Sequence, residues 1–134
     1  MLNVKNLSCG YDAEFVLRGL DFEVADGELI GIIGPNGSGK TTFLRSVSRI
    51  LKPWQGSISI EGKDIWQMRF QDLARKMAVV PQDFSGMNMS VEEFVLLGRT
   101  PYFRRFQMLE NKADMEIALR SMELTDTLEL RGHQ

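Results

Sequence analysis

Cysteine and histidine are almost absent from this chain of 134 residues, which contains one of each. A single thiol, Cys9, cannot form an internal disulfide, so the sequence favours a reducing, cytoplasmic setting. Because no second cysteine and no neighbouring histidine accompany it, we interpret Cys9 as a structural residue.

Long hydrophobic runs and an excess of charge of one sign are missing as well. The longest apolar stretch, residues 29–33, includes Gly31 and is far too short to cross a bilayer. The first five residues alternate between apolar and polar types, unlike a signal peptide. Lys and Arg total 16 against 18 Asp and Glu, and this balance leaves no basic surface for nucleic acid. The sequence therefore predicts neither a membrane span nor a nucleic-acid partner.

The composition that remains is that of an ordinary globular domain, with 43% hydrophobic and 25% charged residues. The length suffices for one domain rather than two. The period of the apolar residues changes along the chain, from strand-like segments up to residue 82 to helical spacing from Ser90 onward. We therefore predict a mixed part, residues 1–82, and a mostly helical part, residues 83–134.

Alternation of apolar and polar residues indicates the first strands. Residues 2–7 have this pattern, and the cluster 8–12 has the composition of a turn. Residues 21–24 alternate between charged and apolar types, which predicts a half-buried strand. Residues 57–61 indicate an exposed strand that ends at Gly62.

Two further segments have the composition of buried strands. Residues 29–33 follow the tight-turn signal Asp26-Gly27 and are apolar on both faces, as in a central strand of a covered sheet. Residues 77–80 have the same character and end at Pro81.

Helices are predicted between and after these strands. The apolar residues of segment 43–51 fall at helical spacing, and a proline stops that helix. A short helix is expected around residues 72–76. Ser90 with Glu93 three residues later forms the capping-box pattern, and a second helix begins near Asn111.

The strongest functional signal is the segment Gly34-Pro35-Asn36-Gly37-Ser38-Gly39-Lys40-Thr41, which matches the phosphate-binding pattern G-x-x-x-x-G-K-[ST]. Its glycines let the backbone curl so that successive N–H groups point at phosphate oxygens, and the following helix directs its positive dipole end there. Lys40 adds a positive charge at the β- and γ-phosphates, and the Thr41 hydroxyl can ligate magnesium. The sequence thus predicts a site for ATP with Mg²⁺ on residues 34–42.

The alternative for this segment is a glycine turn that closes a strand–helix unit and binds nothing. An accidental match is expected in roughly one chain in 200 of this length. The match also lies between an apolar segment and an amphipathic one, which is the context that the motif requires. Composition and context therefore favour a bound phosphate.

Two weaker patterns suggest a GTPase. Residues Asp83–Gly86 match D-x-x-G, and Asn111–Asp114 match the guanine-reading N-K-x-D. An Asp reads guanine only where a buried strand presents it at a sheet edge, and residues 104–110 do not have the composition of such a strand. We interpret both matches as accidental, and a GTPase switch remains one alternative.

With these motifs in place, the chain resembles the nucleotide-binding subunits of ABC transporters over its whole length. Within that family it is most similar to the ATPases of importers for iron–siderophores, haem and cobalamin. The family resemblance rests on Val4–Leu7, Gly10-Tyr11, Leu17–Leu20, 34–42, Gly56–Gly62 and Val79–Gln82, and the narrower one on Leu97–Tyr102 and Leu124–Leu128.

The resemblance implies an α/β fold with a P-loop NTPase core, an antiparallel β flap made by the early strands, and part of a helical subdomain. It implies ATP-driven import of a metal chelate. The partners would be a second ATP-binding subunit, forming a homodimer, and transmembrane permease subunits, with the protein peripheral on the inner face of the cell membrane. Residues 83–131 would face the permease, and the aromatic–basic cluster Tyr102–Phe106 is either part of that contact or a loop pinned by its aromatic side chains.

The resemblance also assigns roles to single residues. Tyr11 takes the place of the aromatic residue that stacks on adenine, which is physically reasonable because every base has a π-face; the alternative is a turn tyrosine with a solvated hydroxyl. Gln82 takes the place of the glutamine that reaches magnesium and the attacking water. The candidate catalytic residues are Lys40 and Gln82, the candidate magnesium ligands are Thr41 and Gln82, and the nucleotide-binding set is Tyr11, Asn36, Gly37, Ser38, Gly39, Lys40, Thr41 and Thr42.

Three motifs of the family have no match in this sequence. They are the LSGGQ-type signature, the Walker B Asp with its catalytic Glu, and the switch His, because His133 follows no strand-like segment. The chain therefore resembles the N-terminal half of the family's domain, and we expect these 134 residues alone to be inactive. A non-catalytic ATP-binding half-domain is the second alternative.

Overall fold

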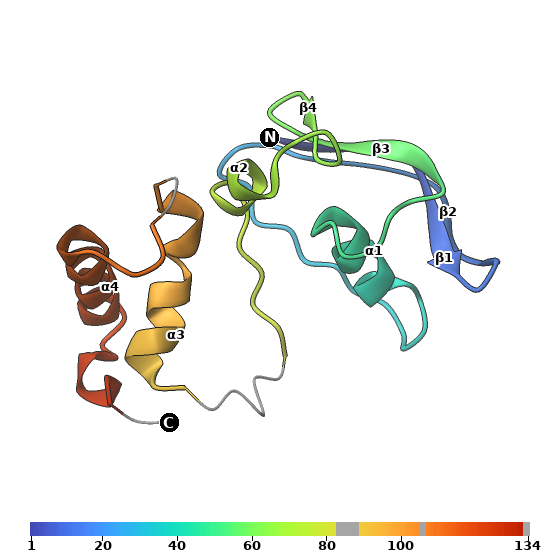
Figure 1. The fold of residues 1–134 in the computed structure, drawn as a ribbon. Helices are drawn as coiled ribbons and strands as arrows, with labels where there is room; N and C mark the ends of the chain where they lie inside the picture. Colours follow the sequence, from blue (N-terminus) through green and yellow to red (C-terminus); the bar gives the residue numbers. More distant parts are fainter. Residues whose placement is uncertain (83–88, 105–106, 133–134) are drawn as a thin grey trace. The chain divides into compact units, whose positions relative to one another are not determined.

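The computed structural model describes residues 1–82, 89–104 and 107–132 (Figure 1). By their contacts the residues form two compact units, Met1–Leu73 and Ala74–Gln134. The functional division after residue 82 stays a prediction.

The first unit is built on an antiparallel sheet of four strands. β1 (Leu2–Tyr11) forms a hairpin with β2 (Glu14–Val24), and β3 (Gln55–Ile60) pairs with the other side of β1. The short strand β4 (Lys63–Asp64) completes the order β2-β1-β3-β4. The predicted antiparallel flap is therefore confirmed.

Helix α1 (Lys40–Val47) packs on this sheet through aromatic and sulfur contacts. The ring of Phe43 meets the ring of Phe22 on β2 edge to face, with centroids 5.2 Å apart. Ser46 donates its hydroxyl to the Sγ atom of Cys9 at 3.2 Å, and both side chains are fully buried. The burial of Cys9 supports its interpretation as a structural residue.

The prediction of buried strands at 29–33 and 77–80 is wrong. Both segments are coil. Leu29 is 98% exposed, Ile33 95% and Val80 85%. A strand forms only where a neighbour completes its hydrogen-bond ladder, and within the ranges that the structure describes no strand pairs with either segment. Apolar composition alone was therefore a misleading signal.

Smaller corrections concern the ends of elements. The predicted turn 8–12 is mostly strand, because β1 continues to Tyr11 and the turn is Asp12-Ala13, where φ is 47° and 68°. The strand predicted to be exposed at 57–61 is β3, in which Ile58 is fully buried against β1. The predicted short helix at 72–76 is α2 (Phe70–Ala74).

The first helix ends at Val47 rather than at residue 51, because Arg49 adopts a left-handed conformation with φ of 62°. The Arg49 side chain stabilises this turn. It donates to the carbonyl oxygens of Met68 at 2.8 Å and Trp66 at 3.3 Å, and its guanidinium lies 4.3 Å from the centroid of the Phe70 ring. These contacts are distant in sequence, so helical spacing could not have revealed them.

The second unit consists of α3 (Val91–Leu97), the 3-10 turn η1 (Thr100–Tyr102), α4 (Lys112–Leu124) and the 3-10 turn η2 (Leu128–Leu130). Its core contains Leu96 of α3 and Ala118 and Met122 of α4. No helix in the described part of the chain is long and apolar enough to cross a membrane.

Both long helices of this unit begin with a capping box. At α3 the Ser90 amide donates to the Glu93 carboxylate at 2.7 Å, and the Ser90 hydroxyl accepts from the Glu93 amide at 3.3 Å. Asn111 and Asp114 form the corresponding pair at α4. The predicted N-cap at Ser90 and the predicted start near Asn111 are confirmed.

Asp114 connects α4 to the segments before it. Its carboxylate accepts hydrogen bonds from Arg99 Nε at 3.1 Å, Gln107 Nε2 at 2.9 Å and the Asn111 amide at 3.3 Å, and the residue is 4% exposed. Burial alone would raise the pKa of this carboxyl, but the bonds from Asn111, Gln107 and Arg99 hold the pKa below its usual value. The pattern at 111–114 is therefore a helix start and not a guanine-reading element; the D-x-x-G match at 83–86 lies outside the described residues.

The lowered pKa makes a prediction about stability and pH. A group whose pKa is depressed by folding stabilises the folded state above its unfolded pKa, and this contribution disappears as the pH falls through the folded value. We expect Asp114→Ala to lower the midpoint of thermal unfolding at neutral pH, measured by circular dichroism. The difference from the unsubstituted chain should shrink below about pH 4.

Glu116→Ala is the matched control, because Glu116 is exposed on the same helix. Equal midpoints for Asp114→Ala and the unsubstituted chain at neutral pH would contradict the role assigned to Asp114.

Candidate functional site

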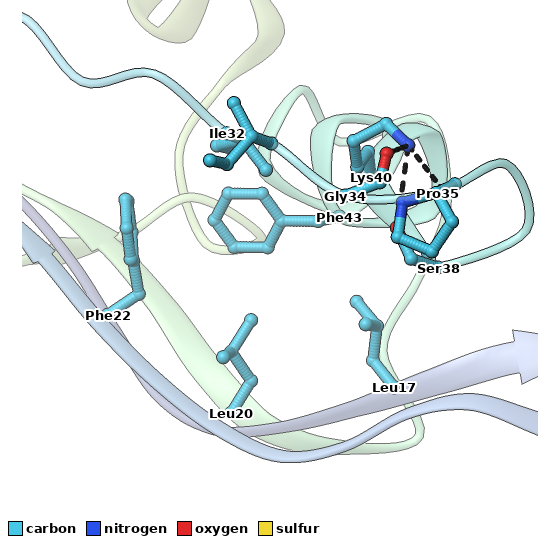
Figure 2. Close-up of a pocket in the computed structure, with 11 residues that line it drawn as sticks. Leu17, Leu20, Phe22, Ile32, Gly34, Pro35, Ser38, Lys40 and Phe43 are labelled. Atoms are coloured by element: carbon cyan, nitrogen blue, oxygen red, sulfur yellow. Dashed lines mark hydrogen bonds between the residues drawn. The ribbon is translucent and has the colours of Figure 1, made fainter.

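The candidate phosphate loop connects the coil 29–33 to α1 (Figure 2). Gly37 and Gly39 have φ of 82° and 89°. This is a left-handed backbone conformation that residues other than glycine rarely adopt. Gly39 is the N-cap of α1, and no side chain caps the helix there. The first turn of the helix also contains no acidic residue. The positive end of the α1 dipole and its N-terminal amides are therefore available to an anion.

Lys40 lies across the loop that precedes it. Its ammonium donates to the carbonyl oxygens of Gly34 at 2.8 Å and Pro35 at 2.7 Å, and it lies 3.4 Å from the Ser38 hydroxyl. All three partners are neutral, and within residues 1–82, 89–104 and 107–132 no salt bridge involves this ammonium. The charge of Lys40 is thus held at the loop without being neutralised.

The remaining loop residues divide by exposure. Asn36, Gly37, Ser38 and Thr41 are exposed, whereas Thr42 is 6% exposed and packs inside the first unit. Ser38, Lys40 and Thr41 lie at the start of α1, and the Lys40 ammonium contacts the Ser38 hydroxyl. Their proposed contacts with nucleotide and magnesium stay predictions.

Tyr11 is the last residue of β1 and is 40% exposed. Its phenolic oxygen accepts a hydrogen bond from Arg45 Nη1 at 3.2 Å. This bond from Arg45 is the main reason why the pKa of the Tyr11 phenol is lowered, and the Thr42 hydroxyl acts in the same direction. Tyr11 is therefore linked to α1, the helix that begins at the phosphate loop. Its adenine-stacking role and the alternative of a turn tyrosine both stay predictions.

Gln82 belongs to the second unit, and its side chain is exposed. Its assignment as a magnesium and catalytic residue stays a prediction. His133 lies outside the described residues.

A pocket of about 360 Å³ opens beside the loop (Figure 2). Its walls are mostly apolar, and the polar side chains at its border are Lys40 and Ser38. Apolar walls offer no ligands to a triphosphate, so we place the phosphates at the loop and the helix start. The pocket could not be predicted from the sequence, because residues 29–33 were expected to form a covered strand. The apolar side chains that line it are Leu17, Leu20, Phe22, Ile32, Ile33, Pro35 and Phe43.

The aromatic–basic cluster of the second unit is described in part, since Arg105 and Phe106 lie outside the described residues. The ring of Tyr102 has the Arg99 guanidinium at 4.4 Å and the Arg75 guanidinium at 5.2 Å from its centroid. Arg75 also donates to the carbonyl oxygen of Pro101 at 2.8 Å. These contacts fix η1 through cation–π interactions. The contact of this cluster with a partner stays a prediction.

Comparison with known proteins agrees with this geometry. The ABC transporter family model matches residues 17–133. A zinc uptake system ATP-binding protein of Listeria monocytogenes is 39% identical over an alignment of 145 residues, which covers 100% of this chain and 55% of the relative. A petrobactin import ATP-binding protein of Bacillus anthracis is 32% identical over 135 residues, covering 100% of this chain and 48% of the relative.

A solved structure agrees as well. The structure of an ATP-binding subunit of an ABC transporter superposes with a TM-score of 0.78 at 30% identity, over 98% of this chain and 53% of the other. The chain spans about half the length of the curated relatives it matches.

The loop geometry predicts how glycine substitutions act. An added Cβ at Gly39 would lie 2.7 Å from Cδ2 of Leu17 and would also force a side chain into left-handed backbone. We expect Gly39→Ala to lower the free energy of unfolding by about 1–2 kcal/mol in urea titrations. Gly31→Ala is the control, because nothing lies within 4 Å of that position. Equal losses in both variants would show that the loop conformation does not depend on Gly39.

Proposed function

The chain belongs to the ABC transporter family, and from this premise we propose that it binds ATP with magnesium on residues 34–42. The observation that carries the proposal is the position of Lys40. Its ammonium is held by neutral oxygens beside an uncapped helix start, so that a phosphate can replace those oxygens with a large electrostatic gain. The loop supplies its amides and the helix its dipole to the same place.

In hydrolysis, Lys40 and the loop amides would stabilise the charge on the γ-phosphate while water attacks in line. Lys40 would exchange its bonds to the carbonyl oxygens of Gly34 and Pro35 for bonds to the phosphate. Gln82 would take the place of the family's glutamine that reaches magnesium and the attacking water, and it would orient that water.

The oxygen-bearing side chains near the loop suit magnesium, which prefers hard oxygen ligands and is usually bound by one or two protein groups plus phosphates. Thr41 is exposed in the first turn of α1 and would hold the ion at the loop. Gln82 stays the second magnesium ligand implied by the family resemblance. When bound, the ion would neutralise charge on the β- and γ-phosphates.

We further propose that the chain acts with a second ATP-binding subunit and with membrane-spanning permease subunits, on the cytoplasmic face of the membrane. The cargo would be a metal or a metal chelate. This is supported by relatives whose names specify zinc uptake and petrobactin import. The residues of this chain would power transport, while the cargo site would lie in other subunits.

The first test is the affinity of the chain for ATP with Mg²⁺, measured by calorimetry. Removing the charge-assisted contact of Lys40 should weaken binding by about 1.5–3 kcal/mol, roughly ten- to a hundredfold. Lys52→Ala is the matched control, because Lys52 is exposed and lies after the end of α1. Unchanged binding in Lys40→Ala would refute the phosphate assignment.

The second test is turnover. This sequence has no match for the family's catalytic carboxylate, and a general base typically contributes about 10²–10⁴ in rate. It also has no match for the signature motif that closes the partner's site. We therefore expect these 134 residues alone to release no phosphate from ATP above buffer. Steady release from a monodisperse monomer, abolished by Lys40→Ala, would contradict this expectation.

A further inference from the structure

We propose that Arg45 is a positioning residue for the base of the nucleotide, because it fixes the ring of Tyr11 to the helix that carries the phosphate loop. The inference rests on the proposed function, in which Tyr11 stacks on adenine. It adds a residue that the phosphate-binding motif does not include.

The geometry places both ends of the nucleotide site on one helix. Lys40 is the first residue of α1, and Arg45 lies in its last turn, five residues and about 7.5 Å further along the axis. Arg45 Nη1 reaches the Tyr11 hydroxyl at 3.2 Å. The spacing between the base platform and the loop is thus set by a single rigid element.

Tyr11 needs such an anchor because of where it lies. It is the last residue of β1, directly before the turn Asp12-Ala13, and its side chain is 40% exposed. A ring at a hairpin tip that is held only by its own strand would sample several rotamers, and a base would have to select one of them. A hydrogen bond from Arg45 removes that cost before the nucleotide binds.

The Arg45 side chain can be replaced without removing the backbone bonds that close the helix. The carbonyl oxygen of Arg45 accepts from the amides of Ile50 at 2.8 Å and Leu51 at 2.9 Å, and substitution keeps both bonds. The side chain itself is exposed. An Arg45 variant should therefore fold, and its binding defects report on the contact with Tyr11.

The experiment compares two ligands, ATP and inorganic tripolyphosphate, each with Mg²⁺. Arg45→Ala should weaken ATP about fivefold, the value of one hydrogen bond, and leave tripolyphosphate unchanged. Tyr11→Phe should give the same pattern, and the double variant should be no weaker than either single one. Arg45→Lys should recover part of the loss. Arg18→Ala, on the same hairpin, is the control that should change neither ligand.

A spectroscopic measurement tests the contact without any ligand. The chain has two tyrosines, so in a Tyr102→Phe background the phenol absorbance reports on Tyr11 alone. Because the Arg45 bond lowers the pKa of that phenol, Arg45→Ala should raise the pH at which it ionises.

Three results would overturn the proposal. These are unchanged ATP affinity in Arg45→Ala, an equal loss for ATP and tripolyphosphate, and an unchanged phenol titration. If the proposed phosphate binding itself is wrong, the result is a different one. Lys40→Ala would then bind both ligands as the unsubstituted chain does, whatever the Arg45 variants show.

Discussion

The attachment of α1 to the antiparallel sheet is the constraint on which the rest of the first unit depends. The helix contacts β1 and β2 through Phe43 against Phe22, Ser46 against Cys9 and Arg45 against Tyr11. The three contacts come from residues 43–46, which make up about one turn of an eight-residue helix. A helix this short has little stability of its own in water, so its orientation, and with it the direction of its dipole, comes from the sheet.

The loop before this helix is stabilised without a ligand by bonds that a bound phosphate can replace. Its glycines accept a backbone conformation that costs other residues energy, and the Lys40 ammonium compensates by binding two carbonyl oxygens. The same ammonium is the group that an anion would attract. The loop is thus stabilised without a ligand by interactions that a phosphate can exchange for stronger ones, which keeps the site formed at low cost.

Features set by neighbouring residues could be predicted from the sequence, and features set by distant ones could not. The loop motif and the capping boxes at Ser90 and Asn111 depend on spacings of a few residues, and the structure contains all of them. The failed strands at 29–33 and 77–80 required partners elsewhere in the sheet. The Arg45–Tyr11 bond joins residues 34 positions apart, and neither residue type signals the other.

The burial of Cys9 gives the first unit an internal reporter. Its thiol has no exposed surface and accepts a hydrogen bond from α1, so an alkylating reagent can reach it only when the first unit opens around it. Since the chain has no other cysteine, the rate of its modification measures how often this part of the unit opens. A ligand that binds across the loop and Tyr11 joins the helix to the sheet, and it would therefore slow the labelling of a residue that it never touches.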